Sequence, residues 1–262
     1  MLKLHILASG SRGNATIVEN DQTGHGVLVD CGICKRDFLA RCDEAHFDPA
    51  NIDAVLITHG DHTKGLGVVM RGLAKMGRQP LVYAADETVR ASKAVQDATS
   101  SCETRSFRPE ECLTAAGISI FPFATSHDAA ASFGFRFEAN GDAAGFMTDT
   151  GIVTPQAHAH LADVRLLALE SNHDPKMLSE GPYPYVVKQR IASDKGHLSN
   201  EQAAEELASL LSNRLQAVAT MHVSENNNEY DLALRAFRAV MEREGCAARV
   251  TCGYQGRLST LA

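Results

Sequence analysis

Short apolar runs alternate with helix-like patterns along the whole chain, and the runs rich in β-branched residues predict strands. Two of these runs, Asp53–Thr58 and Leu166–Glu170, are almost entirely apolar, which is typical of strands covered on both faces. Asn140-Gly141 lies between two others and predicts a tight hairpin turn. The remaining predicted strands are Leu4–Ala8, Ala15–Glu19, Gly26–Asp30, Leu81–Ala84, Ile118–Phe123, Ser132–Glu138, Ala143–Thr148, Leu215–His222 and Arg249–Cys252.

Four segments have the spacing and the caps of amphipathic helices. Asp86 and Ser199 are the expected N-caps of two of them, and Gln202 completes a capping box with Ser199. Because strands and helices interleave without a linker, the pattern predicts one α/β domain over residues 1–262, with helices outside two central sheets. The predicted helices are His62–Met76, Asp86–Asp97, Ser199–Ser212 and Asp231–Glu244.

Composition and charge exclude several classes of function. The formal charge of −7 excludes a basic surface spread over the whole molecule, but it allows a local basic patch. The absence of tryptophan argues against a base-stacking platform. No apolar run is long enough to span a membrane. The chain begins with an expected strand rather than a leader, and its seven cysteines are irregularly spaced, so we expect a cytoplasmic protein with free thiols.

The segment Thr58-His59-Gly60-Asp61-His62 is the strongest local signal for chemistry. It lies between a buried strand and a helix, where loops present short side chains to a crevice. Imidazole and carboxylate groups at this density suit a borderline divalent cation. The alternative is a simple helix start, with Asp61 as a favourable charge in the first turn and both histidines on the surface.

Three further predicted strands end in residues that bind metals. Ser126-His127-Asp128 follows one strand, Thr148-Asp149-Thr150 follows the next, and His222 ends a third. Each of these residues alone could be an ordinary hydrogen-bonded side chain. Their shared position at strand ends, together with His59 and His62, favours a common metal site.

In their order along the chain, these motifs resemble those of the metallo-β-lactamase-fold hydrolases. Five further motifs resemble one branch of that family, the YycJ/WalJ-type proteins: Leu7–Asn14, Glu170–Asp174, Gly181–Tyr185, Ser193–Asn200 and Ser224–Asn227. The resemblance extends from residue 4 to about residue 255. It implies an αββα four-layer sandwich, a metal site at one edge of the sheets, and a DNA exonuclease linked to 5′ ends.

The first motif departs from the family pattern, His-x-His-x-Asp-His, by two missing residues, one of which is a histidine. The resemblance implies one metal position built from Asp61, His62, Asp149 and His222, and another built from His59, His127 and Asp149. The second position has lost an imidazole, so we expect one or two divalent ions, zinc or manganese first and iron as an alternative. Gly60 is expected to let the shortened loop turn tightly.

The expected substrate-binding residues surround this site. His197 lies before a capped helix, where it is expected to bind substrate or stabilise a leaving oxygen. Asp61 is the second expected catalytic residue, because it could orient or deprotonate a metal-bound water. Four basic residues are expected at a phosphate-binding rim: Lys64, Lys188, Arg190 and Lys195.

Other histidines and cysteines carry weaker signals. His158 and His160 have metal-like spacing but lie on a predicted helix, where such residues point apart, so we expect both on the surface. His25 and His46 are expected in exposed loops, His173 is either a support for the site or structural, and the sequence does not place His5. Two cysteines, Cys31 and Cys34, have the spacing of a redox pair, although buried and turn positions explain them equally well.

The sequence therefore predicts a metal-dependent hydrolase, and the resemblance implies a phosphodiesterase acting on DNA. Two alternatives remain at this point. The same fold could hydrolyse a small ester, thioester or lactam, which a rim with few basic residues would favour. The shortened first motif could instead leave a metal-poor protein that binds nucleic acid or another partner with weak catalysis.

Overall fold

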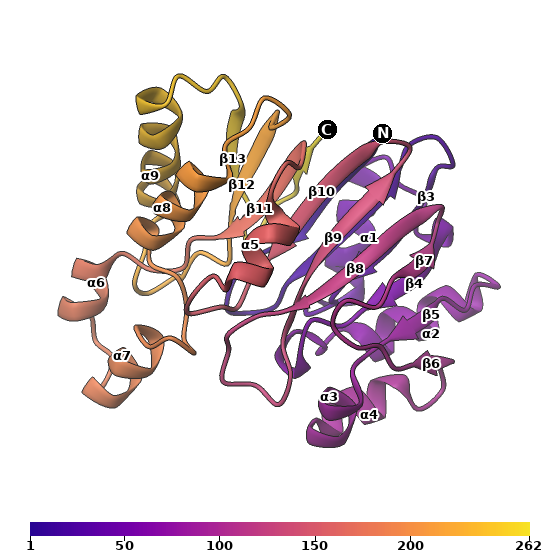
Figure 1. The fold of residues 1–262 in the computed structure, drawn as a ribbon. Coiled ribbons are helices and arrows are strands. Elements are labelled where there is room, and N and C mark those ends of the chain that lie inside the picture. The colour runs from indigo at the N-terminus through magenta and orange to yellow at the C-terminus, as the bar shows by residue number, and fades with distance from the viewer.

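Two mixed β-sheets lie face to face at the centre of the protein, in a computed structural model that describes residues 1–262 (Figure 1). The strands of the first sheet, in spatial order, are β14 (Ser259–Leu261), β1 (Leu2–Ala8), β2 (Ala15–Asn20), β3 (His25–Val29), β4 (Ile52–Leu56), β5 (Leu81–Tyr83) and β6 (Thr104–Arg105). Those of the second are β13 (Arg249–Cys252), β12 (Ala217–Met221), β11 (Leu166–Glu170), β10 (Asp142–Met147), β9 (Phe133–Ala139), β8 (Ile118–Ala124) and β7 (Leu113–Ala115).

Each sheet combines an antiparallel part with a parallel part. Strands β3 to β6 are parallel in the first sheet, and strands β10 to β13 are parallel in the second. Parallel strands of one sheet end at the same edge, and the crevice outside their carboxyl ends is the usual place for a ligand in such sheets. The topology therefore brings the loops that follow β4, β10, β11 and β12 toward one another.

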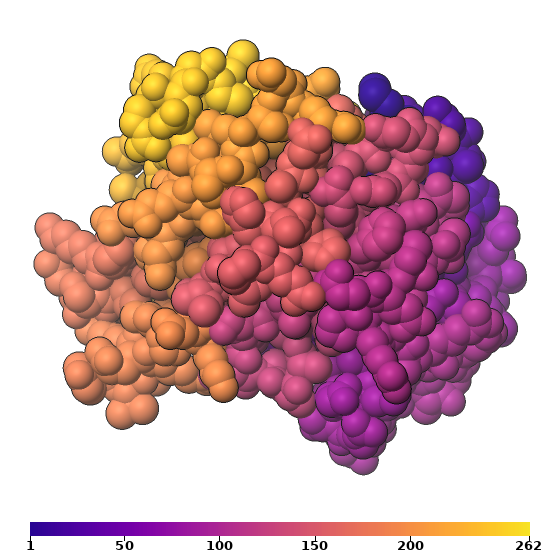
Figure 2. Space-filling view, in the orientation of Figure 1, coloured from indigo at the N-terminus to yellow at the C-terminus, as the bar shows by residue number.

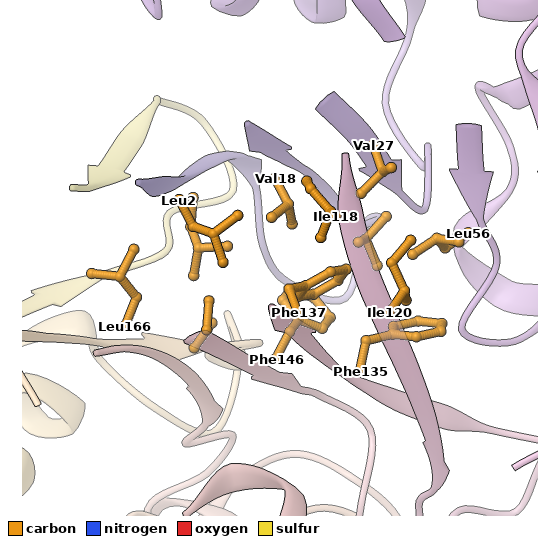
Figure 3. Packing of buried hydrophobic residues seen from close by; sticks show 14 of the residues in the cluster. Leu2, Val18, Val27, Leu56, Ile118, Ile120, Phe135, Phe137, Phe146 and Leu166 are labelled. Carbon is orange, nitrogen blue, oxygen red and sulfur yellow. The ribbon is translucent and has the colours of Figure 1, made fainter. Parts of the chain in front are cut away.

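The core between the sheets consists of 27 buried apolar residues from both inner faces. Figure 3 shows Phe135, Phe137 and Phe146 of the second sheet directed toward aliphatic side chains that include Val18 and Leu56 of the first. All three phenylalanines are fully buried, and replacing one by alanine in such a core costs about 3–5 kcal/mol. This core holds the two sheets at a fixed separation beneath the site.

Helices cover the outer faces and make four layers, as the resemblance implied. On the first sheet, α1 (Lys35–Glu44) and α2 (Leu66–Lys75) bury an apolar cluster, with α3 (Asp86–Ala91) and α4 (Lys93–Thr99) beside them. On the second sheet, α5 (Pro155–Leu161), α8 (Asn200–Leu210) and α9 (Tyr230–Arg243) do the same. The short helices α6 (Pro175–Glu180) and α7 (Tyr185–Ile191) project at the lower left of Figures 1 and 2. None of the helices is both long and apolar enough to cross a membrane.

Two predicted helices differ from the structure. The segment His62–Met76 is interrupted, because the carbonyl of His62 accepts a hydrogen bond from Cys31 instead of continuing a helix. In place of one helix, the chain forms a 3₁₀ turn over Gly60–His62, and α2 follows this turn. The segment Asp86–Asp97 is broken at Ser92, whose extended backbone caps α4, and the N-cap of α3 is Ala85 rather than Asp86. The Asn140-Gly141 hairpin and the Ser199 capping box are confirmed.

Two of the histidines expected in loops or on the surface lie elsewhere. His25 begins β3 instead of lying in a loop, and its Nδ1 is 2.8 Å from Oδ1 of Asp53. His160 is mostly buried, because its ring stacks on Phe123 and its Nε2 lies 2.8 Å from a carboxylate oxygen of Glu110. As predicted, His158 points apart from His160 on α5, and it contacts Glu206. The buried His5 bridges Glu19 and Thr260 within the first sheet.

Candidate metal centre

Five imidazoles and two carboxylates meet where the strands of both sheets end. His59 and His62 follow β4, and His127 follows β8. Asp149 follows β10, and His222 follows β12. His197 lies in the loop before α8, and Glu170 is the last residue of β11. All the positions expected at strand ends from the sequence are thus close together, and Glu170 joins them.

The five imidazoles form a closed ring in which each has two imidazole neighbours. The ring centroids are 4.8 Å apart for His59 and His62, and 5.3 Å apart for His59 and His127. His197 is 5.0 Å from His127 and 5.1 Å from His222. His62 and His222, at 5.4 Å, close the ring. Bringing five imidazoles so close is unfavourable if they are protonated, so the arrangement requires nearby negative charge or metal ions.

Asp149 provides that charge beside three of the five imidazoles. Its carboxylate lies 3.3 Å from Nε2 of His62, 3.4 Å from Nδ1 of His222 and 4.0 Å from Nε2 of His59. Burial by itself raises the pKa of this carboxyl, but the three imidazoles outweigh burial and hold the pKa well below its usual range. Asp149 is therefore ionised and faces three nitrogens at once, as a ligand between two metal ions must.

Two of these strand ends have an unusual backbone. Asp149 has φ of 58° and His222 has φ of 52°, in the left-handed region that L-residues rarely adopt. Asp30, at the end of β3, has φ of 56°. Such conformations cost of order 1–3 kcal/mol each and are found mostly where function requires them. The side chains of Asp149 and His222 line the cavity at the strand ends, and the carboxylate of Asp30 accepts hydrogen bonds from Thr58.

Glu170 has a role in the site that its position in the sequence did not indicate. Its Oε1 lies 3.0 Å from Nδ1 of both His197 and His222 and accepts the backbone N–H of Asp149, while its Oε2 accepts those of Thr150 and Leu198. Burial raises its pKa, but the charges and hydrogen bonds of the two histidines lower it to about 2. Five donors occupy its two oxygens, so Glu170 orients the histidines rather than binding a metal ion.

His222 shows most directly that a ligand belongs in this site. Its Nδ1 is held by Glu170 and Asp149, whereas its Nε2 is buried and has no hydrogen-bond partner. Burial lowers the pKa of this imidazole, but the two carboxylates outweigh it and raise the pKa to about 9. A buried nitrogen without a partner is rare in proteins, and a metal ion would satisfy it by displacing its proton.

The shortened motif places His59 between His62 and His127. The hydroxyl of Thr58 donates to Asp30 at 2.6 Å, so its oxygen accepts from Nδ1 of His59 at 3.0 Å. This arrangement keeps the proton on Nδ1 and leaves the Nε2 lone pair of His59 for the site. Burial lowers the pKa of His59 to about 4, so the imidazole is neutral near pH 7.

Gly60 has a different role from the expected one. Its φ is not in the left-handed region, so no tight turn depends on it. Instead, a Cβ at this position would lie 3.1 Å from Cβ and 3.2 Å from Oγ of Ser92. Gly60 therefore allows a close approach between the metal motif and the junction of α3 and α4.

Asp61 lies at the rim of the site. Its side chain is 81% exposed, and its carboxylate is 4.0 Å from Nε2 of His59. The ligand atoms of His59, His62 and Asp149 all lie within 4.8 Å of one another, and Asp61 is outside this group. A second such group joins Asp149 and Glu170 to His197 and His222. The structure thus brings together three of the four residues expected at the first metal position and leaves Asp61 beside them.

The donor set fits divalent ions. His62, Asp149 and His222 point into one side of the ring, and His59 and His127 line the other. His127 is oriented by the carbonyl of Gly196, which lies 3.1 Å from its Nδ1. His59, His127 and His222 are held through Nδ1, and imidazoles oriented in this way, together with a carboxylate, are the usual ligands of zinc and other borderline divalent metals.

A cavity of about 280 Å³ opens over the imidazole ring and is large enough for a small substrate group. Tyr183, Val187 and Ile191 form an apolar wall beside it. Of the four expected basic rim residues, only Arg190 lines this cavity, and it pairs with Asp128. Lys188 is directed to the carbonyl of Ser179, and Lys64 and Lys195 are exposed outside the cavity.

The two cysteines with redox spacing do not form a reactive pair. Cys31 is buried beneath the loop, and burial raises the pKa of its thiol well above the usual value. Cys34 is exposed at the start of α1, and the two are not disulfide-bonded. A thiol that stays protonated is a poor nucleophile, so Cys31 acts as a small apolar residue.

Comparisons with known proteins agree with this fold. The chain is 33% identical over 246 residues to exodeoxyribonuclease YycJ of Bacillus anthracis, covering 93% of this chain and 90% of that protein. It is 36% identical over 236 residues to exodeoxyribonuclease WalJ of Streptococcus pneumoniae serotype 2, with coverages of 88% and 85%. The metallo-β-lactamase fold protein YhfI of Bacillus subtilis superposes with a TM-score of 0.71 over 99% of both chains, at 16% identity. The family model of the β-lactamase superfamily domain matches residues 25–219. The chain therefore belongs to the β-lactamase superfamily, among the metallo-β-lactamase-fold proteins of the YycJ/WalJ type.

Proposed function

We propose that this protein is a metal-dependent phosphodiesterase that degrades DNA from an end, with the 5′ end as the point of attack. The observation that carries the proposal is Asp149, ionised beside three imidazoles of a ring of five, in a relative of two exodeoxyribonucleases. Five imidazoles so close together would repel one another if protonated, which is unfavourable for structure alone, whereas the same groups form a suitable donor set for divalent ions that catalyse phosphodiester hydrolysis.

Six residues would hold the metal ions. His62, Asp149 and His222 would bind one ion, with Asp61 moving in from the rim as the fourth ligand. His59, His127 and Asp149 would bind a second ion, with one imidazole fewer than in the family pattern. We propose zinc or manganese as the metal, with iron as the alternative. A divalent ion bound here supplies a hydroxide nucleophile at neutral pH and neutralises charge on the phosphate oxygens.

The remaining residues position the substrate and move protons. His197 is held through Nδ1 by Glu170, so its Nε2 faces the cavity. In its protonated form it can donate to the leaving oxygen, and Glu170 stabilises the positive charge. Asp61, at the rim, is placed to orient an attacking water. Arg190 faces the same cavity and can contact a phosphate. The seven cysteines are unpaired, which supports our inference of a reducing, cytoplasmic location.

The test is hydrolysis of a 5′-phosphorylated DNA duplex with zinc or manganese supplied, monitored by release of nucleotides. The Asp149→Asn variant, which keeps the backbone geometry but removes the charge, should lose nearly all activity. The matched control is Asp163→Asn, because Asp163 also has a left-handed backbone, with φ of 56°, but is absent from the cavity lining. Hydrolysis of a small carboxylic ester but not of DNA would contradict the proposal.

A further inference from the structure

A second pocket, of about 430 Å³, adjoins the metal cavity on the side of α3 and α4. The two pockets share four lining residues, which are Asp61, His127, Asp128 and Arg190. In Figure 1 the loop between β8 and β9 lies between α7 on one side and α3 and α4 on the other. This loop and the two helical segments form the walls of one continuous depression, so a chain that leaves the metal cavity can enter the second pocket directly.

Thr88 contributes a polar group without a partner to the lining of the second pocket. It is 2% exposed and is the one buried residue of the pocket lining. Its hydroxyl is fully buried and has no hydrogen-bond partner in the protein. Buried hydroxyls without a partner are rare, and a turn of the Thr88 side chain toward the pocket would let a ligand oxygen satisfy this one.

The charges of the pocket favour an anionic ligand beside Lys93. Lys93 lines the pocket from α4 and takes part in no ion pair, so its ammonium group is available. Arg190 and Asp128 pair with each other across the boundary of the two pockets. The carboxylate of Asp61 is on the metal side, 4.0 Å from His59. Lys93 is therefore a positive charge of the second pocket that no carboxylate neutralises, and it does not line the metal cavity.

The dimensions also suit a sugar-phosphate chain. Ala129, Ala130 and Ala131 form one wall, and their short side chains leave the width free. Gly60 lies at the boundary, where a Cβ would press on Ser92. Gly60 therefore allows the metal motif to lie against Ser92, which lines the same pocket.

We propose that this second pocket binds the phosphodiester linkage next to the one being hydrolysed, with Lys93 on the phosphate and Thr88 on a phosphate or sugar oxygen. This inference rests on the proposed function, because it assigns a second position along the same polynucleotide. Arg190, which lines both pockets, contacts the chain between the two linkages. The protein thereby distinguishes a polynucleotide from a small phosphodiester that fills only the metal cavity.

The experiment compares two substrates of the metal-loaded protein: a 5′-phosphorylated single-stranded DNA oligonucleotide and bis(p-nitrophenyl) phosphate. Lys93→Gln should raise KM for the oligonucleotide about 3- to 10-fold and lower the salt slope of binding by about one, as removal of one phosphate-binding lysine does. Its hydrolysis of the small diester should be unchanged. The control is Lys75→Gln on α2, which removes an exposed lysine outside both pockets.

Thr88→Val tests the unpartnered hydroxyl separately. The replacement has nearly the same shape, and it removes a buried polar group that forms no bond in the protein. Thermal stability should therefore be equal to or higher than that of the unmodified protein, while oligonucleotide binding becomes weaker. A loss of stability without any change in binding would show a purely structural role and overturn the inference.

Binding of a fluorescent oligonucleotide, measured by anisotropy, separates this inference from the proposed function. If the protein hydrolyses neither substrate, the proposed function fails, and the effect of Lys93→Gln on binding still decides whether the pocket holds a phosphate. Equal losses on both substrates, no effect of either variant on the oligonucleotide, or no oligonucleotide binding at all would each overturn the second subsite.

Discussion

Nδ1 of His222 lies 3.0 Å from Oε1 of Glu170, and the same oxygen lies 3.0 Å from Nδ1 of His197. One carboxylate oxygen thus fixes the orientation of two imidazoles that belong to different loops. Since both histidines are held through Nδ1, both present Nε2 to the cavity. Glu170 thereby connects a proposed metal ligand to a proposed proton donor.

Glu170→Gln should lower the affinity for zinc about 10- to 100-fold, as the loss of a group that orients a ligand typically does. The NH₂ group of the glutamine would face either the backbone N–H groups of Thr150 and Leu198 or the two imidazoles. Because an NH₂ group donates and cannot accept, it would replace hydrogen bonds with contacts between donors. Competition with a chromogenic chelator measures the affinity. Glu201→Gln, an exposed position at the start of α8, is the control and should leave the affinity unchanged. Equal affinities for the two variants would contradict the orienting role.

Asp149→Asn should reduce metal content more than His197→Ala does. Asp149 faces three imidazoles, whereas His197 contacts Glu170 and the substrate cavity. Elemental analysis of both purified variants against the unmodified protein measures the difference. If metal content fell equally in the two, His197 would have to be reassigned as a ligand.

Restoring the family pattern tests the shortened motif. The shortened loop contributes one imidazole, His59, to the proposed metal position that also contains His127 and Asp149, whereas the family pattern contributes two. The unmodified protein should therefore be isolated with closer to one metal ion than two. A two-residue insertion after Thr58 that creates His-x-His-x-Asp-His should bring the stoichiometry to two, measured by titration. Two equivalents of matched affinity in the unmodified protein would show that the shortened loop is harmless.

The salt dependence of DNA binding should depend on Arg190 rather than on Lys188. Arg190 lines the metal cavity, whereas the ammonium group of Lys188 donates to the carbonyl of Ser179 at 2.7 Å. Removing one side chain that binds a phosphate lowers the slope of log affinity against log salt by about one. Arg190→Gln should show that decrease, and Lys188→Gln should keep the slope of the unmodified protein. A flat response in the unmodified protein would contradict a polynucleotide substrate.

His173 should make the protein sensitive to acid. Burial lowers the pKa of this imidazole from 6.5 to about 4, so the unfolded chain binds a proton in that interval while the folded protein does not. The free energy of unfolding must therefore fall as pH decreases from 6.5 to about 4. His173→Gln should remove about 1–3 kcal/mol of this loss. Urea unfolding at the two ends of the interval measures it, and identical pH profiles for both proteins would contradict the assignment.

The four-layer fold was predictable because its signals are local and its family motifs are specific. Almost entirely apolar runs such as Leu166–Glu170 indicated buried strands, and the capping box at Ser199 fixed the start of α8. The metal motifs stand at strand ends, so their meeting followed from the topology of parallel strands. The expected residues His59, His62, His127, Asp149 and His222 accordingly lie around one cavity.

Features that depend on tertiary hydrogen bonds could not be predicted from the pattern. The carbonyl of His62 accepts the backbone N–H of Cys31, which lies on the far side of a strand and a helix in the sequence, and this long-range bond ends the predicted helix. In the sequence, Glu170 is recognisable only as a charged residue at the end of an apolar strand. The five hydrogen-bond donors that fix its role come from three separate parts of the chain. The exposure of Asp61 likewise depends on the path of the shortened loop.

The left-handed backbone at Asp149 and His222 limits how this site can be redesigned. Asn, Asp, His and Gly adopt that conformation readily, whereas longer or β-branched side chains do not. An attempt to change the preferred metal by placing glutamate at these positions would therefore add backbone strain at the strand ends. Variants with altered metal preference are better sought at His59 and His127, whose backbones have no such restriction.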